Sequence, residues 1–137
     1  MTLTLADRAD ITDVIHLHGH LTDHGELDDY HLVFTPGVHY DVTALGGTVL
    51  TGIDALRTAA DALGTANPVG HHVTGVIVTG IDADHARARS KAIGINADGT
   101  AASLSYDDTL VRTPHGWRID HRVITPHRTP LGGRYDT

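Results

Sequence analysis

The sequence predicts an α+β fold in which helices pack on one face of a bent antiparallel sheet. Apolar residues recur at helical spacing near the N-terminus and again near residues 53–63. From Gly70 onward they recur with the period of two that is typical of strands. Helical segments followed by a run of consecutive strands indicate an α+β domain rather than alternating βαβ units.

The N-terminal part is expected to contain two helices. Residues 4–22 carry apolar side chains close to helical spacing, with Thr4 or Asp7 as the candidate N-cap. A short second helix is expected at residues 26–34, and the turn residues 35–37 are expected to end it.

A hairpin and a third helix are expected before the main sheet. Residues 38–42 alternate like a strand, residues 46–47 are a Gly-Gly turn signal, and residues 48–50 form the expected return strand. Residues 51–54 resemble a capping box and predict a helix that runs to about Leu63.

The second half of the chain is expected to supply the main strands. The Asp-Gly pair at residues 98–99 is a strong hairpin signal, and residues 114–116 form a second turn signal. The expected strands are residues 71–80, 86–95, 101–112 and 117–124. One domain over residues 1–137 is therefore expected, with a core at about residues 5–125 and an irregular tail at residues 126–137.

Composition excludes several functional classes. The 137 residues suit one domain, and the absence of cysteine excludes disulfides and thiolate chemistry. The formal charge of −7, with only ten Lys and Arg residues, argues against nucleic-acid binding. No apolar stretch is long enough for a membrane span and no basic leader precedes an apolar run, so a cytoplasmic location is expected.

An acidic residue among histidines is the first candidate for chemistry. Asp23 follows the first expected helix and is either a helix cap or the base of a buried pocket. A carboxylate beside a histidine in an apolar pocket can remove and return a proton near neutral pH. His71 and His72 are candidate partners. Because neighbours on a strand point to opposite faces, at most one of them enters a cavity, and the sequence leaves open which one.

Two helix histidines offer a metal-dependent alternative. His16 and His20 are four residues apart and share a helix face, so they can bind one metal ion with Asp23 or His24 as a third ligand. This segment lacks the internal general base of an HExxH zinc helix, and the chain has neither a P-loop nor a dinucleotide fingerprint. We therefore expect neither a metal nor an organic cofactor.

Polar residues also interrupt one of the predicted strands. Tyr106, Asp108 and Leu110 share a strand face, and Arg122 on the following strand can pair with Asp108. This pair is either a structural salt bridge or part of a pocket that holds a substrate oxygen.

Four stretches of the chain resemble the SnoaL-like branch of the nuclear-transport-factor-2-like superfamily. The stretches are LTDHGELDDYHLVFTPGVHYDV, TGIDALR, HHVTGVIV and YDDTLVRTPHGWRIDHRVI, within residues 5–125. That group includes scytalone dehydratase, bile-acid dehydratases, ketosteroid isomerases and polyketide cyclases. The resemblance implies a cone-shaped α+β barrel, in which a bent antiparallel sheet encloses a pocket and the N-terminal helices pack on it.

The resemblance also implies site residues. In the dehydratases an Asp at the helix exit pairs with a His at the start of a long strand, and Asp23 and His71 match these positions. The substrate-binding residues expected in the pocket are His18, Tyr30, Tyr40, His72, Tyr106, Asp108 and Arg122. Two departures are His18, where many relatives have tyrosine, and Gly75, where many have asparagine.

These expectations together favour a small-molecule lyase or isomerase of the dehydratase or polyketide-cyclase type. His71, oriented by Asp23, would take a proton next to a carbonyl group that Tyr30, Tyr40 or Tyr106 polarises. The expected substrate is small, hydrophobic and oxygenated, with no nucleic-acid or membrane partner. A homodimer or homotrimer through the exposed face of the sheet is expected. The alternative is a non-catalytic ligand-binding or assembly module of the same fold.

Overall fold

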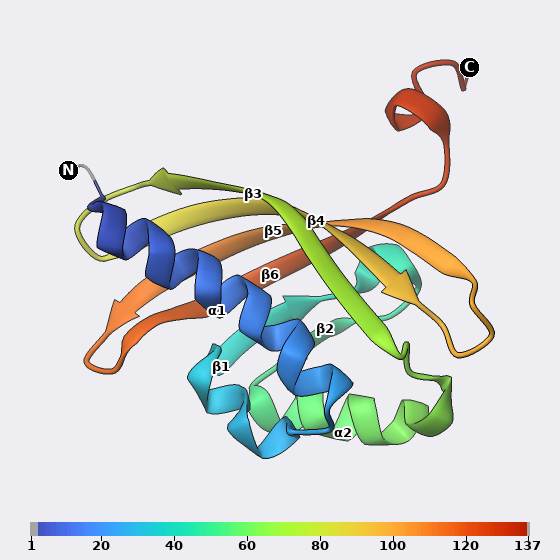
Figure 1. The fold of residues 1–137 in the computed structure, drawn as a ribbon, viewed down its shortest axis with the longest axis horizontal. Coiled ribbons are helices and arrows are strands. Elements are labelled where there is room, and N and C mark those ends of the chain that lie inside the picture. The colour runs from blue at the N-terminus through green and yellow to red at the C-terminus, as the bar shows by residue number, and fades with distance from the viewer. Residues whose placement is uncertain (1–2, 137) are drawn as a thin grey trace.

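Six strands form one bent, open sheet, and a long N-terminal helix crosses its concave face (Figure 1). The computed structural model describes residues 3–136. In chain order the elements are helix α1 (Leu5–Asp23), 3-10 helix η1 (Leu27–Leu32), strand β1 (Phe34–Asp41), η2 (Thr43–Leu45), β2 (Val49–Thr51), α2 (Ile53–Leu63), η3 (Gly64–Ala66), β3 (Gly70–Gly80), β4 (His85–Ile95), β5 (Ala101–Thr113), β6 (Gly116–His127) and η4 (Pro130–Gly133). The predicted α+β class is confirmed. Within the described residues, no helix has the length and apolar character needed to cross a membrane.

The strand order in the sheet is β2-β1-β6-β5-β4-β3. The successive pairs from β3 to β6 are antiparallel, as the hairpin signals predicted. Strand β1 instead runs parallel to β6, which corrects the expectation of a wholly antiparallel sheet. A parallel pair needs a long connection, and residues 42–115, which include α2 and three strands of the main sheet, provide it.

Three predicted boundaries are wrong. Strand β1 already begins at Phe34, so residues 35–37 lie inside the strand, at an irregularity in its pairing with β6 that tolerates a proline. Helix α2 has Gly52 at its N-cap without a side-chain hydrogen bond, so the expected capping box at residues 51–54 does not form. Strand β6 continues to His127 rather than ending at residue 124.

A β-bulge in strand β3 contributes to the bend of the sheet. The pairing of β3 with β4 shifts between Thr74 and Ile77, and Gly75 within this interval has a φ angle of 62°. Glycine adopts positive φ without strain, and asparagine is among the side-chain residues that tolerate it best. The backbone conformation therefore accounts for a glycine at this position.

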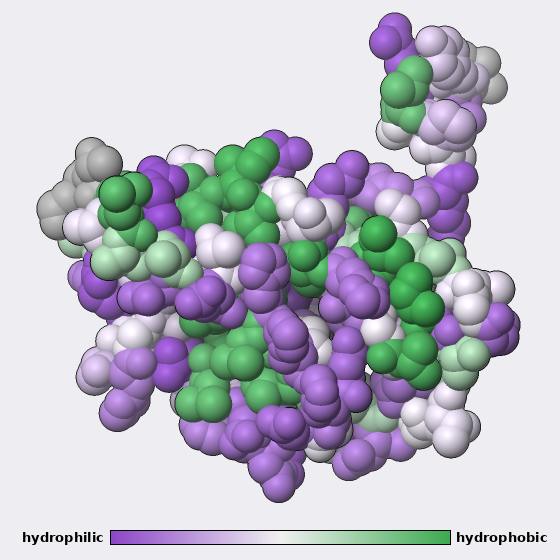
Figure 2. Space-filling view, viewed as in Figure 1, coloured by the Kyte–Doolittle hydropathy of each residue, from purple (hydrophilic) through white to green (hydrophobic). Residues whose placement is uncertain are grey.

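Helix α1 packs an apolar stripe against the sheet, while its outward face is mainly hydrophilic (Figure 2). Ile11 and Ile15 are fully buried, and Leu3 just before the helix is buried as well. The core that they join includes Phe34, Val38, Leu110, Trp117 and Ile119. Each such side chain stabilises the fold by about 1.5–3 kcal/mol on burial. Leu5, at the first position of the helix, is exposed and lies outside this stripe.

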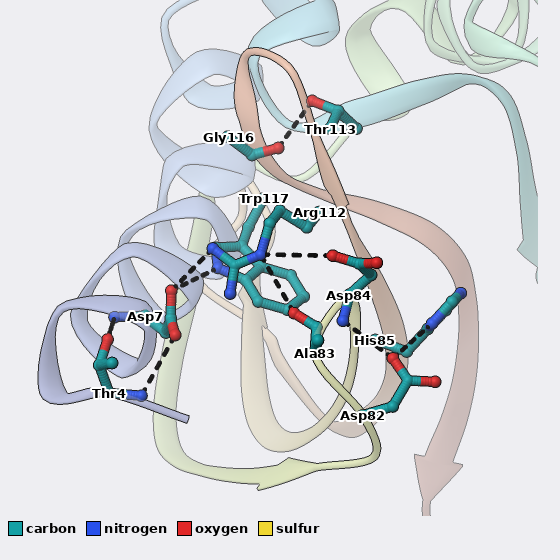
Figure 3. Close-up of polar contacts among 10 residues, drawn as sticks. All are labelled: Thr4, Asp7, Asp82, Ala83, Asp84, His85, Arg112, Thr113, Gly116 and Trp117. Carbon is teal, nitrogen blue, oxygen red and sulfur yellow. Dashed lines mark hydrogen bonds and ion pairs between the residues drawn. The ribbon is translucent and has the colours of Figure 1, made fainter. Parts of the chain in front are cut away.

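A polar cluster fixes the start of α1 to strands β5 and β6 (Figure 3). Thr4 is the N-cap: its side chain accepts from the backbone N–H of Asp7 at 3.0 Å, and the Asp7 carboxylate accepts from the Thr4 N–H at 3.2 Å. The same carboxylate accepts hydrogen bonds from Arg112 Nη1 at 3.0 Å and from Trp117 Nε1 at 3.2 Å. Asp7 is therefore both a capping residue and the anchor of the helix on the sheet.

After β6 the chain leaves the body of the molecule, as Figures 1 and 2 both show. Leu131 and Tyr135 in this segment are 67% and 71% exposed. The segment therefore adds little to the core.

Candidate active site

Asp23 is the last residue of α1, and its carboxylate reaches the start of β3. Its Oδ2 atom accepts a hydrogen bond from the backbone N–H of His71 at 2.9 Å, and Oδ1 lies 2.6 Å from Nδ1 of the His71 ring. Because an ionised carboxylate can only accept, Nδ1 donates this bond and carries the proton of the neutral ring. The other ring nitrogen, Nε2, keeps its lone pair and is the basic atom of the pair.

The Asp23–His71 pair is largely shielded from solvent. The side chains of His71 and Asp23 are 17% and 21% exposed. His71 lines an inner cavity and also an outer cleft, whereas His72 lines only the outer cleft. Of the two strand histidines that the sequence left open, His71 is therefore the one that faces the cavity.

The close approach of α1 to β3 depends on a glycine. A Cβ atom added to Gly19 would lie 2.8 Å from the carbonyl oxygen of His71 and 3.3 Å from its Cβ atom. Any larger residue would have to push the helix and the strand apart. Asp23 follows Gly19 by about one helical turn, so this contact sets the height at which the carboxylate meets His71.

The inner cavity has a volume of about 480 Å³. Its apolar wall comes largely from α2, the residues after β1 and the sheet: Val42, Leu45, Leu50, Leu56, Ala59, Ala60, Leu63, Leu104 and Ile124. The polar side chains that line it include His18, Thr22, Tyr30, Tyr40, His71 and Tyr106. A mainly apolar cavity with a few polar groups is typical of sites that bind small organic molecules.

Asp108 and Arg122 form an ion pair that is fully buried. The Nε and Nη2 atoms of Arg122 donate to the two carboxylate oxygens of Asp108 at 2.7 and 2.9 Å. The remaining terminal nitrogen, Nη1, lies 2.8 Å from Nδ1 of His18. The guanidinium carbon also lies 4.1 Å from the centroid of the Tyr106 ring. Asp108 and Arg122 themselves do not line the cavity; Arg122 contacts its lining through His18 and Tyr106.

His18 is buried between this ion pair and the cavity. Burial lowers the pKa of His18 well below its usual value, and the positive charge of Arg122 lowers it further, as does His71 whenever that ring is protonated. The ring is therefore neutral at neutral pH. Its centroid lies 5.9 Å from that of Tyr40 and 6.1 Å from that of His71.

Three tyrosines bring hydroxyl groups to the cavity. Thr22 donates its hydroxyl proton to the carbonyl oxygen of His18 at 2.8 Å, so its oxygen accepts the proton of the Tyr30 hydroxyl at 2.6 Å. The hydroxyls of Tyr40 and Tyr106 form no hydrogen bond within residues 3–136. Neither hydroxyl oxygen is fully buried, and both residues line the cavity. Burial raises the pKa of all three tyrosines, which keeps them neutral donors.

Two residues of the site were missed at the level of sequence. Thr22 lies four residues after His18, which is the spacing at which helix side chains share a face. Gly19 lies inside an apolar helical pattern, where a glycine often marks a close packing contact. Both signals were present in the segment from His16 to Asp23.

The outer cleft is lined by His16, His20, Asp23, His71 and His72, together with Val73. The histidines and the aspartate are of metal-ligating types. Within the described part of the chain, however, no three His, Asp or Glu side chains are arranged to hold a metal ion. The geometry thus gives no support to the metal-dependent alternative on His16 and His20.

The fold and the cavity define a small α+β domain with a mainly apolar pocket between its helices and its bent sheet. Residues 3–123 match the SnoaL-like domain family, and the chain belongs to this family. The uncharacterised protein Rv2910c of Mycobacterium tuberculosis (strain ATCC 25618 / H37Rv) is 32% identical over 127 residues, which cover 88% of this chain and 86% of that protein.

Solved structures show the same architecture. Kfla4162 from Kribbella flavida superposes with a TM-score of 0.74 at 25% identity, over 93% of this chain and 95% of that one. A protein from Novosphingobium aromaticivorans DSM 12444, provisionally described as a scytalone dehydratase, superposes with a TM-score of 0.75 at 18% identity, over 90% and 86% of the two chains. The second likeness concerns the fold alone.

Proposed function

We propose that this protein is a cofactor-independent lyase or isomerase, of the dehydratase or polyketide-cyclase type, that acts on a small hydrophobic oxygenated substrate. The observation that carries the proposal is the orientation of His71. Its Nδ1 is bound to Asp23 while the ring lines a mainly apolar cavity, which leaves a basic nitrogen for a ligand. Membership of the SnoaL-like family supports it, because this family includes cofactor-independent isomerases, dehydratases and cyclases.

The proposed reaction begins with proton removal from a carbon next to a carbonyl group. Nε2 of His71 takes the proton, and the C–H electron pair forms the enolate. Asp23 holds the ring in place and stabilises the imidazolium that forms. Hydrogen-bond donors in the cavity stabilise the enolate oxygen, where the negative charge develops.

The fate of the proton decides the reaction type. If a hydroxyl group is attached to the next carbon, His71 returns the proton to it, the C–O bond breaks, and water and a C=C bond are formed. If the enolate is conjugated with a C=C bond and the proton returns to the far carbon of this dienolate, the product is an isomer. If the enolate carbon attacks a second carbonyl of the same substrate, a C–C bond closes a ring and the new alkoxide takes the proton from His71. None of these steps needs an oxidant or a reductant.

The test uses α-tetralone, a bicyclic ketone, as a model substrate for proton removal, because it does not require that the natural substrate be known. We expect the protein to accelerate the exchange of the α-hydrogens of α-tetralone for deuterium in D₂O, followed by NMR. His71→Phe and Asp23→Asn should each slow this exchange by about 100-fold or more, the usual size of a general-base contribution.

Matched controls are available on the same elements. His72→Phe changes the neighbouring strand histidine, which does not line the cavity, and Asp10→Asn changes an exposed carboxylate of α1. Both should exchange at the wild-type rate. Exchange that is no faster with wild-type protein than in buffer would contradict the proposal and favour a non-catalytic ligand-binding module.

A further inference from the structure

The protonation state of His18 follows from its contact with Arg122. Nη1 of Arg122 lies 2.8 Å from Nδ1 of His18. A guanidinium group has donors only, so Nδ1 must accept this hydrogen bond. The neutral His18 ring therefore carries its proton on Nε2. This is the opposite tautomer from that of His71, whose Nδ1 is the protonated atom.

The surroundings of Arg122 make this tautomer a fixed property of the site. Arg122 and Asp108 are both 0% exposed, and two nitrogens of Arg122 are held by the two oxygens of Asp108. The remaining hydrogen bond of the guanidinium group that the structure shows is the one to His18, so Arg122 cannot turn away without leaving a buried donor unpaired. Asp108 and Arg122 thus act as positioning residues for His18.

The proton on Nε2 of His18 has no acceptor within residues 3–136, and the ring lines the cavity. A donor without a protein partner on the wall of a mainly apolar cavity is available to a polar atom of a ligand. The hydroxyl of Tyr30 is in a different situation, because its proton is already bound by Thr22.

His18 also lies next to the proposed base. The centroids of the His18 and His71 rings are 6.1 Å apart. A donor and a base at this separation can both contact one ketone group, since each hydrogen bond or proton transfer spans about 3 Å and a carbonyl oxygen is two bonds from its α-carbon. The two rings then bind adjacent atoms of the same functional group.

We infer that Nε2–H of His18 binds the carbonyl oxygen of the substrate while His71 removes the proton from the α-carbon, and that the ligand is a compact, largely apolar ketone. This inference rests on the proposed function for the role of His71. It assigns the polarising hydrogen bond to a neutral imidazole rather than to a tyrosine. Arg122, behind the ring, places a positive charge near the enolate oxygen without touching it.

The first test is made on the wild-type protein and needs no substitution. Nitrogen-15 NMR of the histidine rings should show His18 as the Nε2–H tautomer, and the Nε2 resonance should move when α-tetralone is added. Tetralin, which has the same carbon skeleton without the carbonyl, should leave it unchanged. An Nδ1–H tautomer, or the absence of saturable α-tetralone binding, would overturn the inference.

The second test measures the hydrogen bond on the ligand. In the wild-type complex the infrared carbonyl band of α-tetralone should lie at the low frequency of a hydrogen-bonded ketone. In His18→Leu the carbonyl band should move to the higher frequency of the ketone dissolved in an alkane. α-Tetralone should also bind about tenfold more weakly, which is the usual effect of one lost hydrogen bond, whereas the binding of tetralin should not change.

His18→Gln is the rescue variant, because a glutamine amide can accept from Arg122 and still donate into the cavity. It should restore most of the band shift. A band that stays low in His18→Leu but rises in Tyr40→Phe or Tyr106→Phe would assign the hydrogen bond to a tyrosine and overturn the inference. These readouts do not need turnover. Asp23→Asn should keep the low-frequency band even where deuterium exchange fails. A failure of the proposed function can therefore be distinguished from a failure of the inference about His18.

Discussion

Gly19 of α1 lies directly against His71 of β3, and a Cβ atom at Gly19 would be 2.8 Å from the carbonyl oxygen of His71. This contact places the helix so close to the strand that the carboxylate of Asp23 meets both the backbone and the ring of His71. The geometry of the proposed base therefore depends on the absence of a side chain one turn away.

Gly19→Ala should lower both stability and α-tetralone exchange. The added methyl group has to move α1 away from β3, and overpacking of this kind costs about 1–3 kcal/mol, partly offset by the better helix propensity of alanine. The measurement is urea unfolding together with the deuterium-exchange rate. Gly37→Ala is the control, because a Cβ atom there meets nothing within 4 Å. Equal losses in the two variants would contradict the role of Gly19.

The fold was predictable where local pattern determines it. The alternation of β4 and the turn signals on either side of β5 identified these strands because neighbouring strands of a meander pair through short connections. The start of β1 was missed because Phe34 pairs with Ile119, and no local signal reports a parallel pairing so distant in sequence.

The site was predictable in composition but only partly in geometry. Asp23 and His71 were identified, yet strand parity could not choose between His71 and His72, since both alternating faces of β3 contain valine and threonine or isoleucine. The contact with α1 makes that choice. The contact between His18 and Arg122 joins residues 104 positions apart, so no spacing rule could have revealed it.

Arg122→Leu should be more destabilising alone than in combination with Asp108→Leu. The single change leaves the Asp108 carboxylate buried without its partner, which typically costs about 3–5 kcal/mol. The double change removes both charges and leaves apolar side chains of similar size, so the loss should be smaller. Urea unfolding of the two variants measures this difference. A double variant less stable than the single variant would show that the pair is not coupled in this way.

Asp7→Asn should weaken the fold at pH 7, and progressively less as the pH falls below about 4. The hydrogen bond from Arg112, then those from Thr4 and Trp117, hold the pKa of the Asp7 carboxyl well below its usual range. A folded-state pKa below the unfolded value of about 4 means that the carboxylate contributes stability above pH 4, and this contribution is lost as the pH falls.

Urea unfolding of wild type and Asp7→Asn at pH 7, 5 and 3 measures this effect. The difference in unfolding free energy between the two proteins should be constant from pH 7 to 5 and should shrink towards pH 3. Asp10→Asn, which removes an exposed carboxylate of the same helix, should show no such change. A constant difference down to pH 3 would show that the Asp7 cluster does not depend on the charge of the carboxylate.

His18→Gln should make the protein less sensitive to mild acid. The titratable groups that face His18 include Arg122, His71, Tyr30 and Tyr40. Burial, then the positive charge of Arg122 and that of His71 whenever it is protonated, lower the pKa of His18 in the folded state. Below the unfolded value of about 6.5, the unfolded chain therefore binds a proton that the folded protein does not. Stability is lost as the pH falls through this value, by up to about 1.4 kcal/mol per pH unit for this one group.

The measurement is the slope of unfolding free energy against pH between pH 6.5 and 5. The slope should be shallower in His18→Gln than in wild type, because glutamine does not titrate and still accepts from Arg122. His115→Gln, at an exposed position in the turn between β5 and β6, is the matched control and should differ much less from wild type. Identical slopes in wild type and His18→Gln would mean that His18 takes up a proton in the folded state. That result would also remove the fixed Nε2–H tautomer on which its contact with a carbonyl oxygen depends.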